Sequence, residues 1–163
     1  MKKLAAATIL ISQVSLGSLE YGFTTLDGFA NPEPYKSKTA TVPSQSLVVE
    51  AQEDAEIENC SCSICTMSGY LHLIVPKDNF KILNGKSDLS TYTFNSGVAQ
   101  HYFCKTCGIK PFYIPRSNPD GVDVNVNCLD EPPAKMRIVD FDGQNWEQNA
   151  HTLAHKSKPS PAE

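Results

Sequence analysis

The sequence predicts a mostly β domain that ends in one short helix. Short segments rich in β-branched and aromatic residues are separated by Pro, Asn-Gly and Asn-Ser-Gly, which are typical of turns. Val122, Val124 and Val126 alternate with polar residues, the period-two pattern of a strand with one buried face. Helical spacing is confined to a segment near the C-terminus. We therefore expect several short antiparallel sheets built from hairpins.

The predicted strands follow one another at short intervals. They span residues 47–50, 71–75, 80–83, 91–94, 100–103, 112–114, 122–126 and 137–141. Pro76 and Asn84-Gly85 separate neighbouring strands and favour reversals of the chain. The predicted helix covers 146–155, because Trp146, Ala150 and Leu153 fall on one side of it.

Length, charge and hydropathy restrict the class of partner. The chain has 163 residues, of which 40% are hydrophobic, enough for one domain with flanking segments. The net charge is −4 and Lys and Arg form no long run, which argues against a nucleic-acid partner. The apolar stretch near the N-terminus is far shorter than the ~20 residues that span a bilayer. We expect no nucleic acid and no membrane, and the sequence leaves the oligomeric state open.

The two ends of the chain differ in composition from its middle. Met1-Lys2-Lys3 and the apolar segment after it resemble a secretory signal over residues 1–17. Residues 31–46 contain three prolines and no apolar period, which predicts a linker. Residues 1–45 are therefore expected to be signal-like or disordered, and residues 46–155 to form the domain. Residues 156–163, with two prolines, are predicted to be a disordered tail.

Five of the six cysteines fall into two groups. Cys60, Cys62 and Cys65 form a C-x-C-x-x-C motif, the first cysteine cluster, and Cys104 and Cys107 form a C-x-x-C-G motif, the second cysteine pair. Cysteines at these spacings can turn their sulfurs toward one point, whereas a disulfide framework spreads its cysteines along the chain. The pattern predicts zinc binding, with iron or a redox dithiol as the alternatives.

This metal chemistry bears on the compartment of the protein. Secretion would place closely spaced thiols in an oxidising environment, where they tend to pair with each other. A cytoplasmic location is therefore predicted, and secretion is the alternative if residues 1–17 are a signal peptide.

Five thiols leave two arrangements open, because a closed structural zinc site takes four ligands. The second cysteine pair can complete a site with two thiols of the first cluster. Alternatively, the first cluster holds an ion with an open fourth position, and the second pair finds partners elsewhere. His72 and His101 are further candidates for the fourth ligand of a mixed site. An open position is the one that catalysis requires.

Six motifs occur in an order that is typical of one family. They are Cys60-Ser-Cys-Ser-Ile-Cys65, Leu71-His-Leu-Ile-Val-Pro76, Thr91-Tyr-Thr-Phe-Asn95, His101-Tyr-Phe-Cys-Lys-Thr-Cys-Gly108, Phe112-Tyr-Ile-Pro-Arg-Ser-Asn-Pro-Asp-Gly121 and Cys128-Leu-Asp130. Over about residues 46–150 the chain resembles the family of glutathione-dependent formaldehyde-activating enzyme and centromere protein V. The resemblance implies an Mss4-like zinc-binding β fold that holds two zinc ions.

The resemblance also implies roles for the cysteines. It assigns a catalytic zinc with an open position to Cys60, Cys62 and Cys65, and a structural zinc to Cys104 and Cys107 together with an earlier C-x-C. No cysteine precedes Cys60 in this chain, so half of the structural site is missing. An alternative first exon, a degenerate paralogue or a single rewired site that uses both groups would each account for this departure. A rewired site would use up the open position.

The activity implied by the resemblance is that of a carbon–sulfur lyase. Its substrate is a small thiol adduct, with glutathione and formaldehyde as the reference pair. An open zinc position can bind a thiol and lower its pKa, so the cysteines of the first cluster act as ligands and not as nucleophiles. Arg116 and Asn118 are the candidates for binding an acidic substrate, although turn formation also accounts for them. The alternative function is a non-catalytic, zinc-stabilised scaffold, as resemblance to centromere protein V allows.

Overall fold

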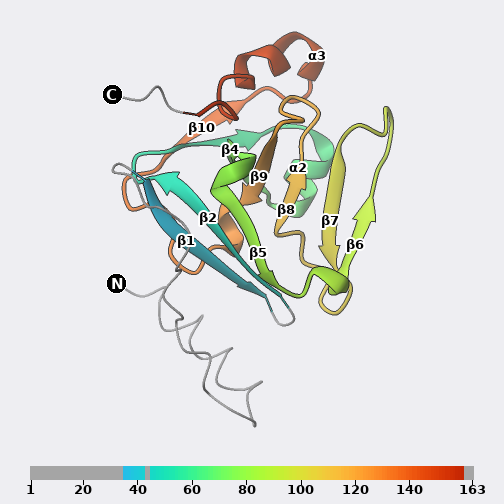
Figure 1. The fold of residues 1–163 in the computed structure, drawn as a ribbon. Coiled ribbons are helices and arrows are strands. Elements are labelled where there is room, and N and C mark those ends of the chain that lie inside the picture. The colour runs from blue at the N-terminus through green and yellow to red at the C-terminus, as the bar shows by residue number, and fades with distance from the viewer. Residues whose placement is uncertain (1–34, 43–44, 160–163) are drawn as a thin grey trace, which may run out of the picture. The chain divides into compact units, whose positions relative to one another are not determined.

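The computed structural model describes residues 35–42 and 45–159. The signal-like segment at residues 1–17 lies outside these ranges. The described chain forms two sheets, and Figure 1 shows how their strands follow one another. The smaller sheet is antiparallel and has the order β1-β2-β5, with β1 at Tyr35–Val42, β2 at Gln45–Gln52 and β5 at Phe80–Asn84.

The larger sheet has the strand order β10-β3-β4-β9-β8-β7-β6. Its strands are β3 (Glu56–Cys60), β4 (Leu71–Pro76), β6 (Leu89–Tyr92), β7 (Gln100–Cys104), β8 (Phe112–Ile114), β9 (Gly121–Asn125) and β10 (Arg137–Phe141). Neighbours pair antiparallel except β10 and β3, which are parallel. The late strand β10 is thereby placed beside the first cysteine cluster, because Phe141 is in register with Cys60.

The helices are short. They are α2 (Ser63–Ser68) and α3 (Trp146–Asn149), with 3₁₀ turns η1 (Lys77–Asn79), η2 (Lys86–Asp88), η3 (Val126–Cys128) and η4 (Ala150–Leu153). Over the described ranges, none of the helices has the length and apolar character needed to traverse a membrane.

The mostly β, Mss4-like fold class predicted from the sequence is confirmed, and each predicted strand has a counterpart. The strand expected at 91–94 lies at Leu89–Tyr92, because Asn95 and Gly97 take positive φ values of 53° and 71° and turn the chain early. The predicted C-terminal helix is divided between α3 and the 3₁₀ turn η4. Strand β3 and helix α2 were not predicted.

The predicted linker is wrong for residues 35–42. These residues form β1, which pairs with β2 along its full length. Lys38 and Ala40 are buried while Thr41 is exposed, and Lys38 Nζ lies 2.7 Å from Glu53 Oε1. Pro34 and Pro43 precede and follow these residues in the sequence, so no proline falls within β1.

The predicted disordered tail is wrong for residues 156–158. Lys156 Nζ forms an ion pair with Glu58 and lies 3.4 Å from Glu56 Oε1. Ser157 is buried and donates a hydrogen bond of 2.7 Å to Asp120 Oδ1, and Lys158 pairs with the same carboxylate. Hydrogen bonds and ion pairs with the domain thus hold this segment in place, although its composition predicted disorder. Residues 160–163 lie outside the described ranges.

The hydrophobic core uses one face of each sheet. It is formed by Ala40, Leu47, Val49, Ala51, Ile57, Leu73, Val75, Phe112, Val122, Val124, Val126 and Leu129. In β9 the intervening residues Asp123 and Asn125 are buried as well, so the polar face of this strand is also covered. The valine alternation therefore predicted the strand correctly but not the burial of its second face, which is the face that carries the candidate site.

Asn118 ties the C-terminal segment to the domain. Its fully buried Nδ2 donates hydrogen bonds to the Leu153 carbonyl at 2.9 Å and to Ser157 Oγ at 3.0 Å.

Asn118→Ala leaves these acceptors without their donor, so we expect a loss of about 1–3 kcal/mol in the free energy of unfolding by denaturant titration. The control is Asn127→Ala, which removes an exposed amide that donates to the Gly69 carbonyl and should cost below about 0.5 kcal/mol. Equal losses in the two variants would contradict this role of Asn118.

Candidate metal centre

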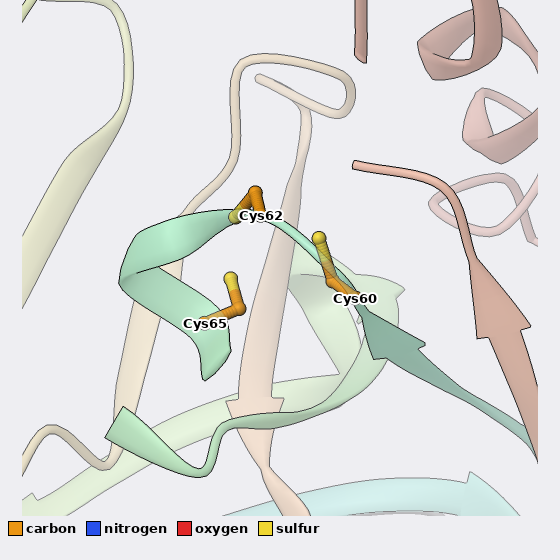
Figure 2. A group of neighbouring side chains, drawn as sticks. All are labelled: Cys60, Cys62 and Cys65. Atoms are coloured by element: carbon orange, nitrogen blue, oxygen red, sulfur yellow. The ribbon is translucent and has the colours of Figure 1, made fainter. Parts of the chain in front are cut away.

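The three thiols of the first cysteine cluster converge where β3 passes into α2. Cys60 is the last residue of β3, Cys62 precedes α2, and Cys65 lies within that helix. Their sulfur atoms lie within 4.8 Å of one another. Figure 2 shows the three side chains directed toward one region, from the end of the strand and from the start of the helix.

The local backbone explains why the C-x-C-x-x-C sequence folds in this way. Cys62 is extended, with φ −67° and ψ 155°, and its carbonyl accepts the first helical hydrogen bond, from Thr66 N. A three-residue separation along a helix places Cys62 and Cys65 on the same side. Gly69 ends the helix with φ 60°, a left-handed conformation that favours glycine. Tyr70 N then donates to the Cys65 carbonyl, which fixes the end of the turn.

The geometry and the charge of the cluster both suit a bound cation. Zinc–thiolate bonds of about 2.3 Å place tetrahedral sulfur ligands about 3.8 Å apart, which small side-chain movements would reach here. Hydrogen bonds from the Cys60 and Cys65 thiols lower the pKa of Cys62 to about 2, with Cys60 contributing most. The same interactions raise the pKa of Cys65, through Cys60 first, and that of Cys60, through Cys62 first. These interactions thus favour a thiolate at Cys62 and disfavour one at Cys60 and Cys65, an imbalance that a bound cation would offset.

The second cysteine pair does not join this cluster. Cys104 is the buried last residue of β7, and Cys107 is exposed in the turn that follows, as predicted for a C-x-x-C between two strands. Gly108, with φ 73°, donates its N–H to the Cys104 carbonyl at 2.8 Å. In the part of the chain that the structure describes, three or more metal-ligand side chains converge only at the first cluster. The mixed arrangement, with His72 or His101 as an added ligand, is therefore not formed.

A cavity of about 250 Å³ adjoins the three thiols. Its walls come from the loop between β6 and β7, the loop after β8, and the segment from β10 to η4. The apolar part of the lining comprises Ile64, Ile74, Phe94, Ala99, Pro115, Phe141, Trp146 and Leu153. The cavity leaves room for a small molecule beside the three thiols.

Of the two predicted substrate residues, Arg116 lines this cavity and Asn118 does not. The Arg116 guanidinium lies 3.6 Å from the centroid of the Trp146 ring and forms an ion pair of 2.7 Å with Glu147. The Glu147 side chain is largely exposed, so an incoming carboxylate can compete for the guanidinium. Asn118 is fully buried and bonded to the C-terminal segment, so its predicted contact with substrate is wrong.

A row of polar and aromatic side chains forms the floor of the cavity, and the sequence had pointed only to its two histidines, as candidate metal ligands. The row consists of Glu58, His72, Asp123, Tyr113 and His101. Strand register brings them together, since Glu58 is opposite His72, Tyr113 opposite Asp123, and His101 opposite Tyr113. The valine alternation carried the signal for Asp123, because it places this residue on the face opposite Val122 and Val124.

His101 is buried in an aromatic stack. Its ring centroid lies 5.4 Å from that of Phe94 and 5.0 Å from that of Tyr113. Burial, and next the positive charge of Lys110, lower the pKa of His101 to about 4. The His101 ring is therefore neutral near pH 7. Lys110 itself is buried, and its Nζ lies 4.4 Å from the centroids of both the Tyr70 and the Tyr113 rings.

A family model described as glutathione-dependent formaldehyde-activating enzyme matches residues 45–147. The chain belongs to this family. A crystal structure of a Rhodobacter sphaeroides protein is also similar, with 31% sequence identity and a TM-score of 0.52 over 56% of this chain and 86% of that one. The family resemblance drawn from the motifs is thus confirmed. The matched range includes both groups of cysteines and most of the cavity lining.

Gly143 gives a test of the thiol geometry that leaves each cysteine in place. A Cβ at this position would overlap Cys60 Sγ and lie 3.0 Å from Cys62 Cβ. In Gly143→Ala we therefore expect zinc affinity to fall by roughly 10–100-fold, the usual effect of disturbing the surroundings of a metal ligand. Competition with a chromophoric chelator measures this affinity.

The matched control is Gly121→Ala, whose Cβ would clash with Ser157 Cβ at 2.6 Å and with the Val75 carbonyl at 2.8 Å. Gly121→Ala should lower the free energy of unfolding and leave the zinc affinity unchanged. A Gly143→Ala protein that binds zinc as tightly as the wild type would contradict the proposed geometry.

Proposed function

We propose that this chain is a zinc-dependent carbon–sulfur lyase that forms and cleaves the adduct of a small thiol with an aldehyde, glutathione and formaldehyde being the reference pair. The observation that carries the proposal is the cavity beside the three converging thiols. A structural zinc is enclosed by four protein ligands, whereas a catalytic one has three and an open position. Membership of the family of glutathione-dependent formaldehyde-activating enzyme supports the substrate class.

Cys60, Cys62 and Cys65 would hold the zinc ion. Bound zinc lowers the pKa of a coordinated thiol and polarises a carbonyl oxygen. The three cysteines are then ligands and not nucleophiles, because their charge is committed to the metal. The second cysteine pair lies outside this centre. The site needs reduced thiols, which supports a cytoplasmic location.

Arg116 is the proposed binding group for a carboxylate of the substrate. Its stacking on Trp146 holds the planar guanidinium in place, so little rotational freedom is lost when an anion binds. The ion pair with Glu147 is at the surface, where such pairs are weak and exchange readily. A bidentate carboxylate of glutathione can therefore replace Glu147.

The apolar wall restricts water at the reacting atoms. Phe94, in the loop between β6 and β7, and Phe141, Trp146 and Leu153, in the segment from β10 to η4, line the same cavity. Exclusion of water strengthens the electrostatic interactions inside and limits competing hydration of the aldehyde. A zinc-stabilised scaffold, the alternative function, requires no cavity next to its metal ion.

Exchange NMR on the zinc-loaded protein tests the proposal. Glutathione and formaldehyde equilibrate with their adduct, and the exchange rate measured by saturation transfer reports catalysis. We expect the wild type to accelerate exchange, Cys62→Ser to return it to the uncatalysed rate, and Cys128→Ser to remain active. Cys128 is the matched control because it lies outside the first cluster.

In the same assay, Arg116→Gln should raise KM for glutathione by roughly 10–100-fold, since a hydrogen bond to a charged group contributes about 1.5–3 kcal/mol. A zinc-loaded wild type that leaves the exchange rate at its background value would overturn the proposed activity and favour the scaffold.

A further inference from the structure

The floor of the cavity contains a buried histidine–aspartate pair that the proposed function does not yet use. We propose that His72 is the proton carrier of the reaction, and that Asp123 is its positioning residue. In this assignment His72 Nε2 accepts the proton of the substrate thiol and returns it to the oxygen of the aldehyde. The inference deepens the proposed function and rests on it.

Hydrogen bonding fixes the tautomer of His72. Its Nδ1 lies 2.8 Å from Asp123 Oδ2, and both side chains are buried. A carboxylate accepts hydrogen bonds, so Nδ1 carries the hydrogen and Nε2 of the neutral ring holds a lone pair. His72 Nε2 is buried without a hydrogen-bond partner among the described residues, and His72 lines the cavity beside the thiols. Nε2 is thus an acceptor that awaits a donor from a bound molecule.

The pair is held rigidly by its neighbours on three strands. β4 and β9 are paired, with His72 opposite Asn125 and Ile74 opposite Asp123. The Tyr70 ring lies 4.6 Å from the His72 ring, and the Tyr70 hydroxyl donates to the Asp123 carbonyl at 2.7 Å. The Tyr113 hydroxyl lies 3.4 Å from His72 Nδ1. A ring held in this way keeps Nε2 in one position, as proton transfer requires.

Other titratable groups around the cavity are less suited to this role. Glu58, opposite His72 on β3, has its carboxylate paired with Lys156. His101 lies between aromatic rings, and neither of its nitrogens has a hydrogen-bond partner among the described residues, so no carboxylate fixes its tautomer. Lys110 is not part of the cavity lining and lies against the rings of Tyr70 and Tyr113. His72 alone in this group combines an orienting carboxylate with a vacant acceptor.

His72 is the only proton carrier that the addition of a thiol to an aldehyde needs. When a thiol adds to an aldehyde, the S–H bond breaks, a C–S bond forms, and the C=O π bond is replaced by an O–H bond. One proton must move from sulfur to oxygen, and His72 Nε2 holds it between the two steps. The reverse sequence cleaves the adduct. Neither direction needs an oxidant, a reductant or a further reactant.

Calorimetry of glutathione binding tests the assignment without turnover. Zinc-loaded protein is titrated with glutathione alone in several buffers of different ionisation enthalpy at pH 7.5, which gives the number of protons released per thiol bound. If His72 takes the proton, the wild type releases about zero protons, whereas His72→Gln releases about one. The control His151→Gln alters an exposed histidine outside the cavity and should match the wild type.

Other results of the same titration would overturn the assignment or the proposed function. Release of about one proton by the wild type, or a rise in release in Glu58→Gln but not in His72→Gln, would overturn the assignment. Asp123→Asn serves as a second variant should His72→Gln fail to fold, and its release should rise toward one because the carboxylate that fixes the tautomer is lost. Absence of any binding heat in the zinc-loaded wild type would overturn the proposed function itself, and His72 as carrier with it.

Discussion

The close approach of three thiols is the constraint on which the rest of the site depends. Three sulfurs within 4.8 Å of one another can share one negative charge through hydrogen bonds, but three thiolates require a cation. The chain reaches this arrangement through the end of β3, the start of α2 and a glycine at position 143 that leaves room for Cys60. The parallel pairing of β10 with β3 brings that glycine to the thiols, so the C-terminal part of the domain completes the centre.

The larger sheet links this centre to the hydrophobic core. One face of β4 and β9 packs into the core through Leu73, Val75, Val122 and Val124, and the other face carries His72 and Asp123 beneath the cavity. Because side chains alternate across a strand, the register that buries the valines also sets the position of the polar row. Stability and the proposed chemistry thus depend on the same strand pairing. The apolar walls and Arg116 are added by loops and by the segment at α3.

The sequence alone predicted those features of the fold and of the site that depend on the spacing of nearby residues. The C-x-C-x-x-C motif predicted convergent thiols, and β-branched segments between turn residues predicted the strands. Features that depend on distant partners were not predictable. β1 forms because β2 pairs with it, although prolines at its ends suggested a linker. Residues 156–158 are held by Glu58 and Asp120, which are remote in sequence. Asn118 was predicted to bind an acidic substrate, but hydrogen bonds to Leu153 and Ser157 hold it in a buried position.

In the proposed enzyme a zinc ion binds to three cysteines and retains an open position for substrate. X-ray absorption spectroscopy at the zinc edge tests it most directly, on protein purified with one zinc ion per chain. We expect three sulfur ligands at about 2.3 Å and one oxygen or nitrogen ligand, with a fourth sulfur appearing when glutathione is added. Four sulfur ligands in the absence of glutathione would contradict it, since no position would then remain for the thiol.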